Sequence, residues 1–183
     1  MNDKNPIRFP GLALKTIVAH TITYFLMGII ASSMFNYAEV FARPYMACWM
    51  RQLSDPLVMA GPLIQPIRGL IFALAFYPLR ETLFSKKNGW LIMWWVLVAL
   101  GILSTFGAAP GSVEGMIYTV IPLRDQLSGW VEVVTQAFLL SAILFYWVRN
   151  PKKRWLGWSL AAIFVMVVLL MIAGLLVTRN VNP

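Results

Sequence analysis

Five long apolar runs, separated by short polar segments, dominate the hydrophobic pattern of this chain. They cover residues 12–35, 57–79, 90–106, 130–148 and 155–177. A hydrocarbon core about 30 Å thick requires about 20 apolar residues of helix, because a helix rises 1.5 Å per residue. The pattern therefore predicts an all-α fold, with residues 1–183 forming a single polytopic membrane domain of five transmembrane helices.

The stretch 107–123 is the ambiguous part of this pattern. It is mostly apolar, so a continuous helix here would make a sixth crossing. Gly107, Pro110, Gly111 and Gly115 disfavour such a helix. We therefore expect an irregular or re-entrant segment on the outer side, with a sixth transmembrane helix as the alternative.

Composition agrees with a membrane location and changes how the charge is interpreted. Hydrophobic residues make up 60% of the chain and charged residues 12%, too few to cover the surface of a soluble domain. A net charge of +8 would suggest nucleic acid as the partner of a soluble protein. Here the basic residues stand at the ends of apolar runs, so we expect membrane lipids and no nucleic acid as partners. The expected location is a cell membrane, of the bacterial inner-membrane type.

The distribution of lysine and arginine predicts the orientation. Basic residues concentrate in three segments that alternate with less basic ones: Lys4, Arg8 and Lys15, then Arg80, Lys86 and Lys87, then Arg149, Lys152, Lys153 and Arg154. The intervening segments hold Arg43, Arg51, Arg124 and Arg179. Because cytoplasmic loops carry the excess of Lys and Arg, the N-terminus is predicted to be cytoplasmic and the C-terminus external.

Arg68 is the most unusual residue, because it lies inside the second apolar run. An arginine at the centre of a membrane helix costs about 2.5–3.5 kcal/mol. Pro62 and Pro66 precede it and are expected to break the helix. Arg68 then either faces a cavity and meets an anionic ligand, Glu132 or Glu114, or reaches the outer interface from a helix that begins near Pro66. Both alternatives place it in the outer half of the membrane.

The fourth run adds polar residues at its outer end. Glu132, Thr135 and Gln136 are spaced to share one helical face. Together with Gln65 and Arg68 they predict a polar pocket that opens outward. We take Arg68, Gln65, Glu114, Glu132 and Gln136 as the candidate ligand-binding residues.

A second polar stripe lies in the first run, towards its inner end. Thr16, His20 and Thr23 share one helical face. His20, the only histidine, could serve a proton relay or contact a ligand, but a hydrogen bond between helices is the favoured interpretation. Haem held by two histidines is excluded within one chain, and we expect no cofactor.

The single cysteine gives little support for metal or redox chemistry. Cys48 excludes an internal disulfide and a CxxC motif. Met46, Cys48 and Met50 are soft ligands that suit Cu(I). On a helix, however, Met46 and Met50 share a face while Cys48 points elsewhere, so we predict no metal site.

Three functions stay open on the sequence. The leading hypothesis is binding or transport of a small molecule or lipid through the pocket around Arg68. The first alternative is an embedded enzyme acting on a lipid-like substrate, with Glu114 or Glu132 as general base. The second is an accessory subunit of a larger membrane complex, and a homo-oligomer is equally compatible with the sequence. No familiar catalytic motif is present.

Overall fold

The computed structural model describes residues 7–181, and their side chains as far as Leu176. Every regular element in this part of the chain is a helix. Four helices are long and apolar enough to cross a membrane, namely α1 (Phe9–Met34), the composite helix Pro56–Phe76, α9 (Leu123–Arg149) and α10 (Arg154–Val181). The prediction of an all-helical chain is thereby confirmed, and four of its helices have the length and composition of membrane spans.

The third apolar run forms a shorter helix than the other four. It consists of α7 (Gly89–Val98) and the π-helical turn η2 (Ala99–Leu103). Together they fall below the length that marks the other four as spans. Four of the five predicted spans are therefore present at full length.

The second span is continuous where the sequence predicted a break. It consists of α4 (Pro56–Ala60), the 3-10 turn η1 (Gly61–Ile64) and α5 (Gln65–Phe76). Both internal prolines stand in the first two positions of η1 and α5. A missing N–H is harmless there, so the helix tightens instead of breaking. Arg68 lies just past the middle of Pro56–Phe76, counted from Pro56.

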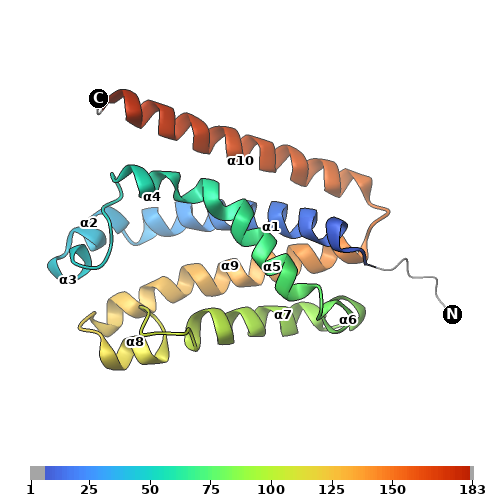
Figure 1. Ribbon diagram of the computed structural model, residues 1–183, viewed down its shortest axis with the longest axis horizontal. Coiled ribbons are helices and arrows are strands. Elements are labelled where there is room, and N and C mark those ends of the chain that lie inside the picture. The colour runs from blue at the N-terminus through green and yellow to red at the C-terminus, as the bar shows by residue number, and fades with distance from the viewer. Residues whose placement is uncertain (1–6, 182–183) are drawn as a thin grey trace.

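Short helices connect the long ones at both ends of the bundle. α2 (Tyr37–Ala42), α3 (Pro44–Ala47) and α8 (Val113–Tyr118) lie at one end, which we call the loop end (Figure 1). With six residues, α8 spans about 9 Å and is no sixth crossing. α6 (Arg80–Ser85) and the α9–α10 turn lie at the opposite end with the start of α1 (Figure 1).

We call this second end the basic end, because the predicted basic segments meet there. Arg8, Arg80 and the turn at 149–154 belong to it. Lys4 and the side chain of Arg179, which also entered the predicted orientation, lie outside the described residues. The start of α1 and the end of α10 lie at opposite ends of the bundle (Figure 1).

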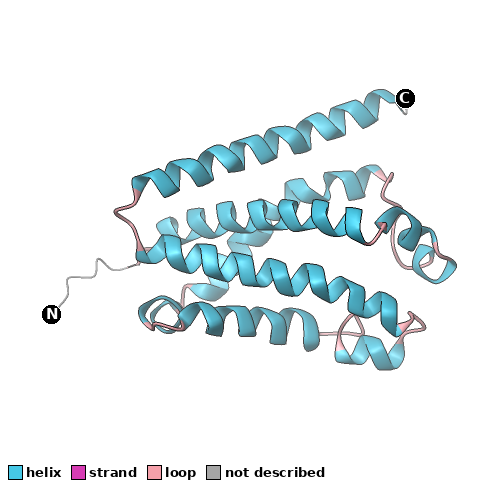
Figure 2. Cartoon of the chain, turned by 180° about the vertical axis from the view of Figure 1, so that it is seen from behind, coloured by secondary structure: helices cyan, strands magenta, loops and turns pink. Residues whose placement is uncertain are grey.

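The main apolar core occupies the half of the bundle nearer the basic end. It joins α1, α5, α6, α7 and α9 through eight buried side chains: Leu12, Ala19, Phe76, Leu83, Phe84, Met93, Leu140 and Leu144. α1 and α5 pack closely because Gly69 has no side chain. A Cβ there would stand 2.7 Å from the Ile17 Cα. α10 lies along the edge of the bundle (Figure 2) and packs through a smaller cluster that contains Val18, Trp147 and Leu160.

Candidate functional site

Two groups of residues that the sequence treated separately meet in the middle of the bundle. The His20 Nε2 atom on α1 lies 3.1 Å from the Gln65 Oε1 atom on α5. His20 is 1% exposed, and its ring makes an edge contact with Phe72. The predicted hydrogen bond between helices is confirmed, and it joins the inner stripe to the predicted pocket residues.

The geometry of Gln65 assigns the tautomer of His20. The Gln65 amide nitrogen donates to the Gly61 carbonyl at 3.2 Å, in the 3-10 turn. The Gln65 carbonyl oxygen therefore faces the imidazole and accepts its Nε2–H. The Nδ1 atom then carries a lone pair, and it is buried without a partner in the described part of the chain. It is free to accept one hydrogen bond.

The two threonines of the predicted stripe have structural roles. The Thr16 hydroxyl donates to the Leu12 carbonyl at 2.8 Å, and the Thr23 hydroxyl donates to the Ala19 carbonyl at 2.9 Å. Both bonds return to the same helix. Each threonine hydroxyl therefore bonds to a carbonyl of its own helix and not to the His20 ring. The three residues do not form a proton relay.

Arg68 is exposed on α5, and none of the described acidic residues pairs with it. None of the ion pairs among the described residues includes it. Its guanidinium lies 5.6 Å from the ring centroid of Phe72. Exposed apolar side chains surround it on the same helix, among them Ile67 and Ile71. The predicted pairing of Arg68 with Glu132 or Glu114 is therefore wrong for the described chain.

Tyr24 on α1 is within electrostatic range of the two unlike charges of this region. Its hydroxyl interacts electrostatically with both Arg68 on α5 and Glu132 on α9. The three residues lie roughly 14–18 Å along their helices from the loop end, at 1.5 Å per residue. A cation, a phenol and a carboxylate from three helices thus share one level near the middle of the bundle. We call His20, Tyr24, Gln65, Arg68 and Glu132 the mid-bundle site.

Glu132 is held by a residue outside the spans. The Tyr37 hydroxyl of α2 donates a hydrogen bond to its carboxylate. Burial raises the pKa of the Tyr37 hydroxyl, and the bond to Glu132 raises it further, so Tyr37 stays a donor. The sequence analysis missed Tyr24 and Tyr37. The spacing of Tyr24 from His20 (i, i+4) could have revealed the first, whereas no sequence signal pairs Tyr37 with Glu132.

The other predicted site residues lie apart from this group. Glu114 is exposed on α8 at the loop end. Gln136 is partly buried on α9, one turn beyond Glu132. No hydrogen bond among the described residues links either one to Arg68.

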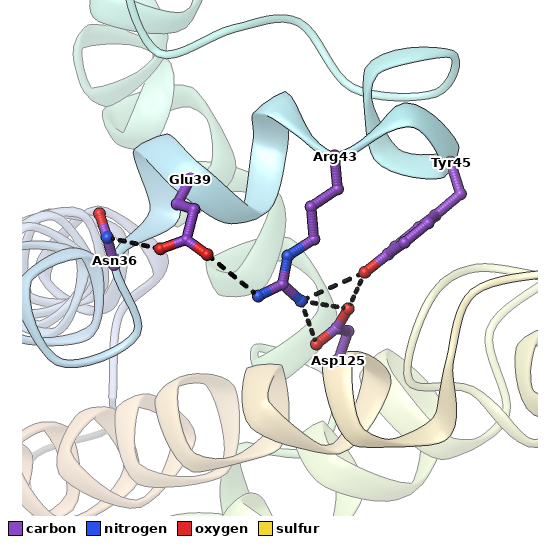
Figure 3. A network of polar contacts seen from close by, with 5 residues as sticks. All are labelled: Asn36, Glu39, Arg43, Tyr45 and Asp125. Atoms are coloured by element: carbon purple, nitrogen blue, oxygen red, sulfur yellow. Dashed lines mark hydrogen bonds and ion pairs between the residues drawn. The ribbon is translucent and has the colours of Figure 1, made fainter.

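A polar network fastens α2 and α3 to the start of α9 (Figure 3). Arg43 pairs with Asp125 at 2.8 Å, and Tyr45 donates to the same carboxylate. Glu39 approaches Arg43 at 3.6 Å and accepts a bond from Asn36. Asp125 and Glu132 are two helical turns apart on α9 and share a face. This network, which we call the polar tether, therefore holds α2 where Tyr37 can reach Glu132.

A second set of contacts from α9 holds the loop before it. The Gln126 amide donates to the Ile121 carbonyl at 2.8 Å and accepts from the Gly111 N–H at 3.2 Å. The Trp130 indole donates to the Gly111 carbonyl at 2.7 Å. Gly111 has φ +86°, a conformation that favours glycine. The segment around α8 is therefore ordered by α9, although it is irregular.

Among the described residues, no three His, Cys, Asp or Glu side chains gather as a metal site would require, and Cys48 is exposed. The mid-bundle site instead offers a cation, a phenol and a carboxylate. These groups suit the binding of a polar head on an apolar ligand. No protein-family model matches the chain, and no curated protein or solved structure matches it.

Proposed function

We propose that this membrane protein binds, or moves, an acidic amphiphile at the mid-bundle site, with Arg68 receiving the anionic group. One observation carries the proposal. Arg68 is an exposed cation near the middle of an apolar spanning helix, and it pairs with no acid in the described chain. A small molecule or a lipid with a carboxylate or phosphate would supply the missing countercharge.

The energies favour a bound anion over an arginine that is satisfied by its own chain. Placing arginine at a helix centre costs about 2.5–3.5 kcal/mol. The contact with Phe72 contributes about 0.5–1 kcal/mol at an exposed position. The ring therefore offsets only a small part of the cost. An anionic partner in the membrane would offset the rest of the cost of placing Arg68 there.

The rest of the site supports a ligand with a second polar group. Tyr24 and Glu132 can accept hydrogen bonds from a hydroxyl or amine. Glu132 already accepts one bond from Tyr37, and Glu114 lies at the surface. Among the described residues, a catalytic set of base and nucleophile is therefore not assembled, and we favour binding or transport over an embedded enzyme.

Oleate, with oleyl alcohol as its neutral analogue, tests this proposal. Oleate should bind the purified protein in detergent more tightly than the alcohol. The Arg68→Gln variant should lose at least tenfold in oleate affinity, about 1.4 kcal/mol, and leave alcohol binding unchanged. Arg124→Gln, which removes an exposed arginine at the loop end, is the matched control. Equal oleate affinity in the wild type and both variants would overturn the proposal.

The proposal includes the full topology of five crossings with the N-terminus in the cytoplasm. The gathering of Arg8, Arg80 and residues 149–154 at one end supports it through the positive-inside rule. The single cysteine, Cys48, is exposed near the loop end and reports on it directly. A membrane-impermeant maleimide should label Cys48 in intact cells. Labelling only after the membrane is opened would refute this orientation.

The accessory-subunit hypothesis has one observation in its favour. α10 exposes a continuous apolar face that includes Trp158, Val165 and Leu169. A partner helix would cover this face, and an acid of the partner could pair with Arg68. In that case the oleate preference would be absent, so the same titration discriminates the two functions.

A further inference from the structure

A separate cavity of about 410 Å³ opens at the basic end of the bundle. It lies between the first turns of α1 and the segment that joins α9 to α10. Its apolar wall is formed by Ile7, Leu12, Val148 and Pro151. Gly11 also lines it, and a Cβ placed there would meet no atom within 4 Å.

The polar part of the lining consists of two cations. Arg8 is exposed at the cavity and Lys15 is partly buried. The Lys15 Nζ atom donates to the Trp147 carbonyl at 3.2 Å and lies 5.6 Å from the centroid of the Trp147 ring. No carboxylate of the described residues lines the cavity, and none of their ion pairs includes Arg8 or Lys15. Within the described part of the chain, Lys15 therefore meets only the neutral Trp147 carbonyl and ring.

The backbone adds to the positive potential of this cavity. α1 begins at Phe9, and the side chain of its N-cap residue, Arg8, makes no capping hydrogen bond. Unpaired amides and the helix dipole favour an anion at such a terminus. The adjacent turn brings further basic residues, Lys152 and Arg154, to the same end. The cavity therefore attracts an anion, and its wall accommodates apolar groups.

We infer that this cavity binds the headgroup of an anionic phospholipid from the leaflet at the basic end, with the phosphate between Arg8 and Lys15. The volume supports a headgroup with its glycerol, because sites for organic ligands span about 300–1,000 Å³. An inorganic phosphate would leave the apolar wall uncovered. This inference is independent of the mid-bundle site.

Native mass spectrometry of the delipidated full chain, mixed with defined lipids, tests the inference. Phosphatidylglycerol should be retained at least tenfold better than phosphatidylcholine. Lys15→Gln should lower this retention about tenfold. Gly11→Leu fills the cavity and should lower it as well. Inorganic phosphate at equal concentration should not displace phosphatidylglycerol.

Matched variants separate the cavity from a general effect of charge or folding. Gly28→Leu lies on the same helix, where a Cβ likewise meets nothing, and should bind as the wild type does. Arg124→Gln removes an exposed cation at the opposite, loop end and should retain the lipid. Unchanged retention in both Lys15→Gln and Gly11→Leu would overturn the inference. Displacement by inorganic phosphate would overturn the assignment to a lipid.

Discussion

The two halves of this bundle are held together in different ways. The half nearer the basic end is closed by buried apolar side chains from five helices. The half nearer the loop end is joined by polar contacts, in which Asp125 and Glu132 hold α2 and α3 against α9. Apolar packing thus fixes the helices near the basic end. The half near the loop end depends less on apolar packing and can therefore contain polar groups without a partner. The mid-bundle site lies where these two regimes meet.

The largest effect is expected in the apolar half. Leu144 is fully buried on α9, so Leu144→Ala should lower the free energy of unfolding by about 2–5 kcal/mol. Leu74→Ala, at an exposed position of α5, is the control and should have a much smaller effect. Unfolding in mixed micelles measures both. A similar loss in the free energy of unfolding for the two variants would contradict the tight apolar packing of this half.

The close approach of α1 and α5 gives the second prediction. A Cβ at Gly69 would stand 2.7 Å from a backbone atom of Ile17, so Gly69→Ala should force the helices apart. We expect a loss of about 1–3 kcal/mol and a weaker His20–Gln65 bond. Gly101→Ala, where a Cβ meets nothing, should be close to neutral. Thermal unfolding and the imidazole NMR signals of the single histidine provide the two measurements.

The polar tether should contribute less than the apolar core. Asp125→Asn weakens the contacts to Arg43 and Tyr45 at a partly exposed site, and we expect about 1 kcal/mol. Hydrogen exchange in residues 37–47 should accelerate, while exchange in α6 and α7 stays unchanged. Acceleration throughout the chain would contradict a tether confined to the loop end.

The smallest effect is a dependence on pH at the start of α4. The Leu57 N–H and then Arg51 lower the pKa of Asp55 below its usual 3.8. Asp55 therefore stabilises the fold above the unfolded pKa, and this contribution disappears as pH falls through the lower native pKa. The difference in stability between wild type and Asp55→Asn should be constant from about pH 7 to 5 and shrink towards pH 3. A difference that grows on acidification would contradict this sign.

The sequence was sufficient for the fold class because a long apolar run has few alternatives to a spanning helix. It also identified Arg68, Gln65, Glu132 and His20 as unusual. It separated Gln65 from His20, because no local periodicity relates residues on different helices. It predicted a broken helix at Pro62 and Pro66, where the 3-10 turn accommodates both prolines. The partnership of Tyr37 with Glu132 depends on the fold of the loop after α1, which composition does not encode.

We have proposed that the mid-bundle site binds an acidic amphiphile through Arg68. The most direct measurement is photo-crosslinking with a diazirine-bearing fatty acid, followed by peptide mapping. We expect labels near Tyr24, Phe72 and Val131, which should be lost in Arg68→Gln and retained in Arg124→Gln. Labels of equal intensity in the wild type and Arg68→Gln, or labels absent from these positions, would contradict it.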